Sequence, residues 1–118
     1  MIEFTINGKV PSKSNCYRII NTGGHASLCK APSLKAYEQA FFLQCPARGT
    51  DMTSLFTIEA DVFYENMRPD LDNCLKIVLD CMQQCRVIRN DRQCVEIRAR
   101  KLIDKNNPRI SIRLEEAL

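Results

Sequence analysis

The chain has 118 residues, of which 45% are hydrophobic and 26% charged, and its formal net charge is +3. This composition is typical of a globular protein with one modest core and argues against a disordered chain. No apolar run approaches the roughly 20 residues of a membrane-spanning helix, and the first residues lack the pattern of a secretory signal. We therefore expect one domain over residues 1–118, located in the cytoplasm.

Alternation of apolar and polar residues predicts four strands. They are expected at residues 2–6, 55–64, 93–102 and 109–114. Two shorter extended segments, 17–20 and 26–29, flank Asn21-Thr22-Gly23-Gly24 and predict a hairpin.

Two other segments predict helices. The first begins near Pro32, with Ser33 as a candidate cap, and ends near Cys45, just before Pro46. In the second, residues 71–84, apolar side chains recur at intervals of three and four positions. The order of elements predicts an α+β domain, in which two principal helices pack on a mixed, mainly antiparallel sheet.

Seven cysteines raise the question of a disulfide or a zinc site. No Cys-x-x-Cys pair is present and His25 is the only histidine, so a tetrahedral zinc site would need almost only cysteine ligands. Cys74, Cys81 and Cys85 share one face of the second expected helix with apolar residues. We interpret these three as small buried side chains and the cysteines in general as free thiols.

Positive charge is concentrated late in the chain. Residues 86–113 contain nine Lys or Arg and three acidic residues, which predicts a footprint for phosphate groups. Arg98 and Arg100 are the best candidates for phosphate contact, since both lie on one face of the expected strand 93–102. A solvated strand face is the alternative that charge alone leaves open.

The most informative motif is acidic. Asp70 and Asp72 stand at the start of the second expected helix, Lys76 follows one turn later, and Asp91 lies beyond the helix end. Three converging carboxylates would hold Mg²⁺ through oxygen, and a lysine would stabilise charge that develops on a phosphate. Two carboxylates about 4 Å apart repel by about 4 kcal/mol at an effective dielectric constant near 20, which favours a bound cation.

Each of these residues also has a purely structural explanation. Asp70 can cap the helix, Asp72 suits its first turn, and Asp72 with Lys76 has the spacing of a surface ion pair. Asn90-Asp91 is a common turn dipeptide. Spacing alone leaves both a structural motif and a metal site open.

Two parts of the chain resemble the RusA family of Holliday-junction resolvases. The first is the segment from Arg68 to Asp80 (RPDLDNCLKIVLD) together with Asn90-Asp91-Arg92-Gln93. The second is Pro11-Ser12-Lys13-Ser14-Asn15-Cys16-Tyr17-Arg18, which resembles that family's early Pro-Ser-x-Asn-x-x-Tyr-Arg segment with an offset of one residue. The resemblance implies a homodimer, of bacterial or phage origin, that uses Mg²⁺ or Mn²⁺ to make paired, symmetric nicks in four-way DNA junctions during recombination and repair.

The resemblance also implies roles for individual residues. Asp70, Asp72 and Asp91 would be the metal ligands, and Lys76 would be the essential lysine near the scissile phosphate. A second, DNA-contacting set combines family positions with the basic strand: Lys13, Asn15, Arg18, Arg68, Asn73, Arg98 and Arg100.

The sequence departs from the family pattern in two places. Several members carry three or four arginines before the Asp-x-Asp element, whereas residues 64–69 contain one arginine and one glutamate. Asn90 stands where members often have a second acid. These departures leave the proposed ligands intact, but they affect the expected affinity for the junction, because phosphate contacts supply much of it.

Three other functions fit the same sequence. A non-catalytic protein of the same fold would bind junctions or duplex DNA without nicking them. A nuclease could act instead on other branched DNA. An interaction module could use its basic face to bind an acidic protein.

Overall fold

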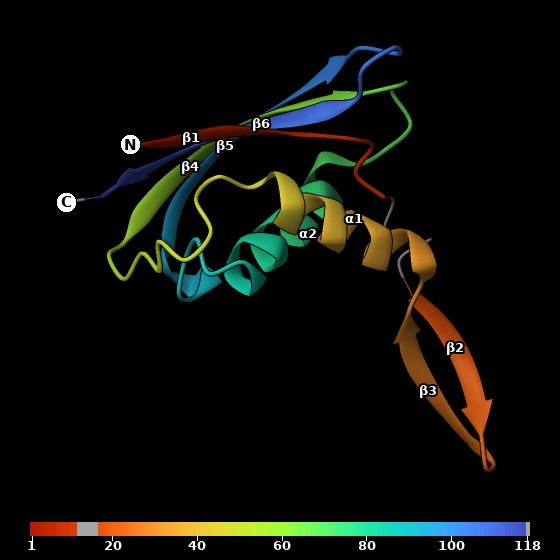
Figure 1. Cartoon of the computed structure of the whole chain (residues 1–118). Helices are drawn as coiled ribbons and strands as arrows, with labels where there is room; N and C mark the ends of the chain where they lie inside the picture. The colour runs from red at the N-terminus through yellow and green to blue at the C-terminus, as the bar shows by residue number, and fades with distance from the viewer. Residues whose placement is uncertain (12–16, 118) are drawn as a thin grey trace.

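A mixed four-stranded sheet organises the molecule (Figure 1). The computed structural model describes residues 1–11 and 17–117. The strands follow the order β1-β6-β4-β5, where β1 is Ile2–Asn7, β4 is Phe56–Tyr64, β5 is Cys94–Ile103 and β6 is Arg109–Glu116. β6 is antiparallel to both β1 and β4, and only β4 and β5 are parallel. The α+β prediction with a mixed, mainly antiparallel sheet is thereby confirmed.

The parallel pair is joined through a helix, because neighbouring parallel strands need a long crossover. This helix, α2, spans Leu71–Gln84, the bounds that the periodicity predicted. It starts just after the carboxyl end of β4. That edge of a parallel strand pair is where open α/β sheets commonly bind ligands, and it is where the Asp70–Asp72 motif lies.

Both helices cover the same face of the sheet (Figure 1). The first, α1, spans Pro32–Gln44 and buries Leu34, Tyr37 and Phe41. Its N-cap is Ala31 and no side chain caps it, so the prediction of a Ser33 cap was wrong. Proline at the first helical position has no N–H to satisfy, which lowers the need for a side-chain cap.

The buried face of α2 contains cysteines, as predicted. Cys74 and Cys81 lie in the core with Val78 and Met82, and the six cysteines within the described residues are all free. Burial raises the pKa of the Cys74 thiol to about 11 and that of Cys81 to about 12. These thiols are therefore protonated near neutral pH and behave as small apolar groups.

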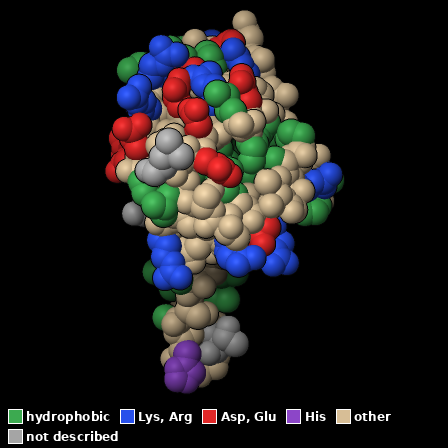
Figure 2. Space-filling view, turned by 90° about the vertical axis from the view of Figure 1, so that its left-hand side faces the viewer, with side chains coloured by type: hydrophobic (Ala, Val, Ile, Leu, Met, Phe, Trp, Pro, Cys, Tyr) green, Lys and Arg blue, Asp and Glu red, His purple; other side chains and the backbone are tan. Residues whose placement is uncertain are grey.

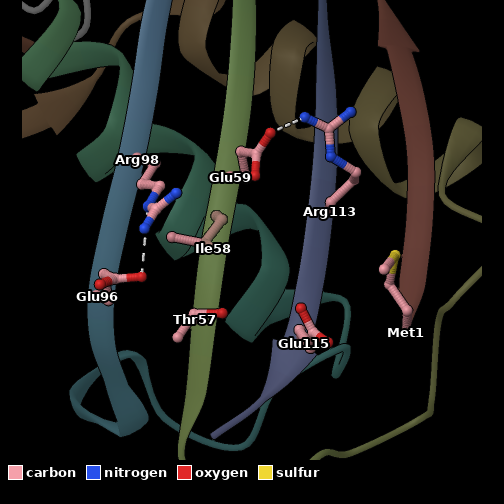
Figure 3. A pocket seen from close by; sticks show the side chains of 8 residues that line it. All are labelled: Met1, Thr57, Ile58, Glu59, Glu96, Arg98, Arg113 and Glu115. Atoms are coloured by element: carbon pink, nitrogen blue, oxygen red, sulfur yellow. Dashed lines mark hydrogen bonds and ion pairs between the residues drawn. The ribbon is translucent and has the colours of Figure 1, made fainter.

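The other face of the sheet carries charged side chains (Figure 3). A hollow of about 230 Å³ opens there, lined by residues that include Glu59, Glu96, Arg98 and Arg113. Figure 3 shows that these four form two ion pairs, Arg98 with Glu96 and Arg113 with Glu59. Because opposite charges face each other, this hollow has no strong net charge with which to attract a phosphate.

A separate hairpin projects from the end of the molecule where α1 begins (Figure 1). It consists of β2, Tyr17–Thr22, and β3, His25–Lys30, which pair only with each other. Gly23 and Gly24 form its turn with φ angles of 58° and 82°, a conformation that favours glycine.

Among the described residues, no helix has the length and apolar content needed to span a membrane.

Candidate active site

Two acidic residues frame the first turn of α2. Asp70 occupies the N-cap position in an extended conformation, yet its side chain makes no capping hydrogen bond. The explanation of Asp70 as a helix cap is therefore not supported. Asp72 accepts a hydrogen bond at 3.0 Å from the backbone N–H of Asn73. Both carboxylates are exposed near the positive end of the helix dipole, which stabilises negative charge.

Lys76 lies one turn further along the exposed side of α2. Its Nζ atom is 3.2 Å from a carboxylate oxygen of Asp80 and 3.4 Å from one of Asp91. Hydrogen bonding to Asp80, followed by Asp91, raises the pKa of Lys76, so the side chain is cationic. Among the described ion pairs Lys76 contacts Asp80 and Asp91 and not Asp72, so the surface pair of the structural explanation is not formed.

Asp91 is held in a short 3-10 turn, Asp91–Gln93, that follows α2. Its backbone N–H donates to Gln83 Oε1 at 3.0 Å, which ties the turn to the end of the helix. Asn90 caps the turn by accepting from the backbone N–H of Arg92 at 3.0 Å. The Asp91 carboxylate is left facing Lys76, with one third of its side chain exposed.

Gln93 has a structural role that the sequence analysis missed. Its Oε1 accepts from the backbone N–H of Asn90 at 2.6 Å, and its Nε2 donates to the carbonyls of Met52 at 2.9 Å and Ser54 at 2.8 Å. Gln93 thus joins the turn to a loop 40 positions earlier. The spacing Asn90-x-x-Gln93 is the signal in the sequence, since it matches a capping box.

Replacing Gln93 with Leu is expected to lower the free energy of unfolding by about 2–4 kcal/mol, because three hydrogen bonds are lost and buried polar groups remain. Urea denaturation measures this change. Gln83→Leu is the matched control: it removes one hydrogen bond at an exposed site and should cost about 1 kcal/mol or less. Equal losses for the two variants would contradict the role assigned to Gln93.

The three predicted metal ligands do not meet within one chain. Among the described residues, no group of three or more Asp, Glu, His or Cys side chains is placed to hold a metal. The reason lies in the geometry of α2. Asp91 and Asp80 both contact Lys76, so Asp91 lies near the level of Asp80, and Asp80 is about 12 Å along the helix axis from Asp72. The chain therefore presents Asp70 and Asp72 at the start of α2 and a separate group around Lys76.

Comparison with known proteins identifies the family to which the chain belongs. The model of the family described as Endodeoxyribonuclease RusA matches residues 11–115. The chain belongs to the RusA endodeoxyribonuclease family. The match covers nearly the whole chain, including the acidic motif, Lys76 and the Asn90–Gln93 turn. Membership implies a nuclease that acts on DNA. None of the curated proteins compared with the chain matches it.

Two of the DNA-contacting residues predicted for this RusA-family chain lie next to its acidic pair. Arg68 is exposed just before Asp70, and Asn73 is half-buried in the first turn of α2. A hollow of about 460 Å³ opens beside Asp70, and Lys9, Arg68 and Pro69 contribute to its lining. Its lining contains two cations, Lys9 and Arg68, and one acid, Glu65, so the hollow adds a small net positive charge beside Asp70.

The remaining members of the predicted DNA-contacting set lie elsewhere. Lys13 and Asn15 fall outside the described residues. Arg18 belongs to β2, and its side chain is not described. Arg98 and Arg100 lie on the sheet face opposite α2, because they are in register with Glu59 and Asp61 and not with the buried residues of β4.

The basic stretch 86–113 is less positive in the fold than in the sequence. Arg100 makes two hydrogen bonds to Asp61, at 2.9 and 3.1 Å, and these lower the pKa of that carboxyl. Five of the nine cations have an acidic partner: Arg89 with Asp51, Arg98 with Glu96, Arg100 with Asp61, Arg109 with Asp104, and Arg113 with Glu59. Three of these acids lie outside the stretch, so counting charges along the sequence overestimated the phosphate footprint.

Proposed function

We propose that this protein is a magnesium-dependent endodeoxyribonuclease that resolves four-way DNA junctions by paired, symmetric nicks, in recombination and repair. The observation that supports it most is the family match over residues 11–115, which includes Asp70, Asp72, Lys76 and Asp91. Asp70 and Asp72 lie at the start of α2, beside the carboxyl end of β4, and Asp91 contacts Lys76 from the turn after α2, which is consistent with that role. The proposed setting is the cytoplasm of a bacterium, with the gene carried by the host or a prophage.

The donor chemistry of the site fits magnesium, with manganese as a substitute. Asp70, Asp72 and Asp91 offer carboxylate oxygens, and these suit hard divalent cations better than zinc. Asp70 is free of a capping bond, so binding a metal would not break the start of α2. The chemistry that such an ion supplies is neutralisation of phosphate charge and a lowered pKa of the attacking water.

Lys76 would stabilise the negative charge that develops on the phosphate during cleavage. Its Nζ is held by Asp80 and Asp91 and two thirds of its side chain is exposed, so it is both oriented and accessible. An ammonium group can act there as a point charge without bidentate geometry. Asp80 would keep Lys76 in place while Asp91 turns to its ligand role.

We infer that the protein works as a homodimer with shared sites. One chain carries an acidic pair at one end of α2 and Asp91 about two turns away, so a single chain does not gather the set. A second copy related by a twofold axis would bring the Asp91 of one chain to the Asp70 and Asp72 of the other. The same axis accounts for paired nicks on a junction that is nearly symmetric.

DNA would be held mainly through its phosphates. Arg68 and Asn73 beside the acids, and the segment that contains Lys13, Asn15 and Arg18, would contact the strand that is cut. Arg98 and Arg100 would have to exchange their bonds to Glu96 and Asp61 for phosphate, which makes them weaker candidates.

A synthetic, mobile four-way junction tests this function. Purified protein with Mg²⁺ is expected to give ligatable linear duplexes, and a chelator in excess should abolish the products while binding persists. Binding without nicking in Mg²⁺ would favour the non-catalytic DNA-binding protein. Preferential cleavage of flaps or forks would favour a nuclease for other branched DNA, and affinity for acidic proteins alone would favour an interaction module.

A further inference from the structure

The positive charge of the chain is concentrated in one early segment. Residues 4–37 contain no Asp or Glu and five Lys or Arg, whereas the rest of the chain contains 12 basic and 14 acidic residues. The first segment therefore has a formal charge of +5 and the remainder −2. The β2–β3 hairpin lies entirely within the acid-free segment.

Large apolar side chains of this hairpin are mostly exposed to solvent. Ile19 is 75% exposed and Leu28 is 69% exposed, and the two face each other across the strand pair. Figure 2 shows the hairpin projecting from the body, with Lys and Arg side chains and an acidic side chain where it leaves, and no acidic side chain on the ribbon itself. An isolated two-stranded ribbon is at best marginally stable in water, and exposed apolar patches usually mark a binding surface.

The dimensions and charge of the ribbon fit DNA. A two-stranded ribbon enters the major groove, which is about 12 Å wide, and strands of six residues are about 20 Å long. Gly23 and Gly24 in the turn carry no side chains, and the exposed His25 that follows them lies at the tip (Figure 2). Apolar side chains at groove depth contact thymine methyl groups, while a ribbon without carboxylates avoids repulsion from the phosphates on either side.

The base of the ribbon adjoins the candidate active site. Pro11, before β2, and Ser33, after β3, both line the hollow that also contains Arg68 and Pro69 beside Asp70. DNA held by the ribbon would therefore continue towards the acidic pair.

We propose that the β2–β3 ribbon is a DNA-binding arm that lies in the major groove of a duplex arm of the substrate. The proposal rests on the proposed function, because it takes branched DNA as the substrate. Ile19 and Leu28 face the base edges. Lys30, at the base of the ribbon, faces the phosphates and exchanges its ion pair with Glu38 for them. The arm supplies affinity for duplex DNA and takes no part in the chemistry of cleavage.

A matched pair of substitutions at Ser27 tests the arm. Ser27 is exposed on β3, next to Leu28 but on the opposite face of the ribbon, so in the groove its side chain points to the mouth, between the two phosphate backbones. Glu and Gln at this position differ in charge but hardly in size. Anisotropy of a labelled four-way junction and of a linear duplex, with chelator present, gives the two Kd values. Ser27→Glu is expected to bind both DNAs about tenfold more weakly than Ser27→Gln. Leu43→Glu and Leu43→Gln, at an exposed site near the other end of α1, are the control pair and should differ by about twofold or less.

A second measurement uses a photo-crosslinking residue. Placed at Leu28 it should crosslink to DNA, and placed at Leu43 it should not. Equal Kd values for the two Ser27 variants, or crosslinks from position 28 to a second copy of the chain in place of DNA, would overturn the proposal. If the wild-type protein does not nick junctions but the two Ser27 variants still differ in Kd, the proposed function is overturned and the DNA-binding role of the ribbon is supported.

Discussion

Asp72→Asn is expected to abolish nicking of a four-way junction in Mg²⁺, with a loss of about a thousandfold or more in rate, because it removes a proposed metal ligand. Junction binding in chelator should survive, or tighten, since the substitution also removes repulsion between the carboxylate and phosphate. Single-turnover nicking and anisotropy, measured on the same labelled junction, separate the two effects.

Asp80→Asn is the matched control for this variant. Asp80 lies on the same helix and contacts Lys76, but it is not among the proposed ligands. We expect its nicking rate to stay within about tenfold of wild type, because only the orientation of Lys76 is affected. If Asp72→Asn nicks junctions as fast as Asp80→Asn, the metal assignment is wrong and the structural explanation of Asp72 stands.

A mixed dimer of one Asp72→Asn chain and one Asp91→Asn chain is expected to regain nicking, although each homodimer is inactive. If sites are shared between chains, one site of the mixed dimer combines both mutated residues, and the other combines intact Asp70 and Asp72 with an intact Asp91. One working site of two should restore nicking to about half of the wild-type rate. Linear duplexes from paired cuts should stay rare, because the second strand is not cut.

Co-expression with two different tags and sequential purification gives the mixed dimer, and a tagged wild-type pair provides the reference. No nicking by the mixed dimer, with normal nicking by the reference, would mean that each site is built within one chain. Elution of the wild-type protein as a monomer, with full activity, would contradict the dimer itself.

Local patterns were enough to predict most elements of the fold. The three- and four-residue periodicity of α2 predicted Leu71–Gln84, and alternation predicted β4 and β6 closely, because these elements bury one regular face. The parallel pairing of β4 with β5 was not predicted, since strand order depends on contacts between distant segments. The Ser33 cap was wrong because Pro32 starts α1 without one.

The candidate site was harder to predict. Which residues are chemically interesting could be read from their types and spacing, but the position of Asp91 depends on where Gln93 and Gln83 hold the turn. The ion pair of Arg100 with Asp61 likewise forms between residues 39 positions apart. Neither contact leaves a signal in a linear count of charges.

Within the tetrapeptide Asn90–Gln93, the side chains that hold the backbone differ from the side chain proposed to bind the metal. Asn90 and Gln93 hold the backbone of this turn through four hydrogen bonds, whereas the carboxylate of Asp91 contacts Lys76. If Asp91 is the metal ligand proposed above, its replacement by Asn would abolish cleavage and leave these four hydrogen bonds in place. One substitution would then turn the proposed nuclease into a protein that binds DNA without cutting it.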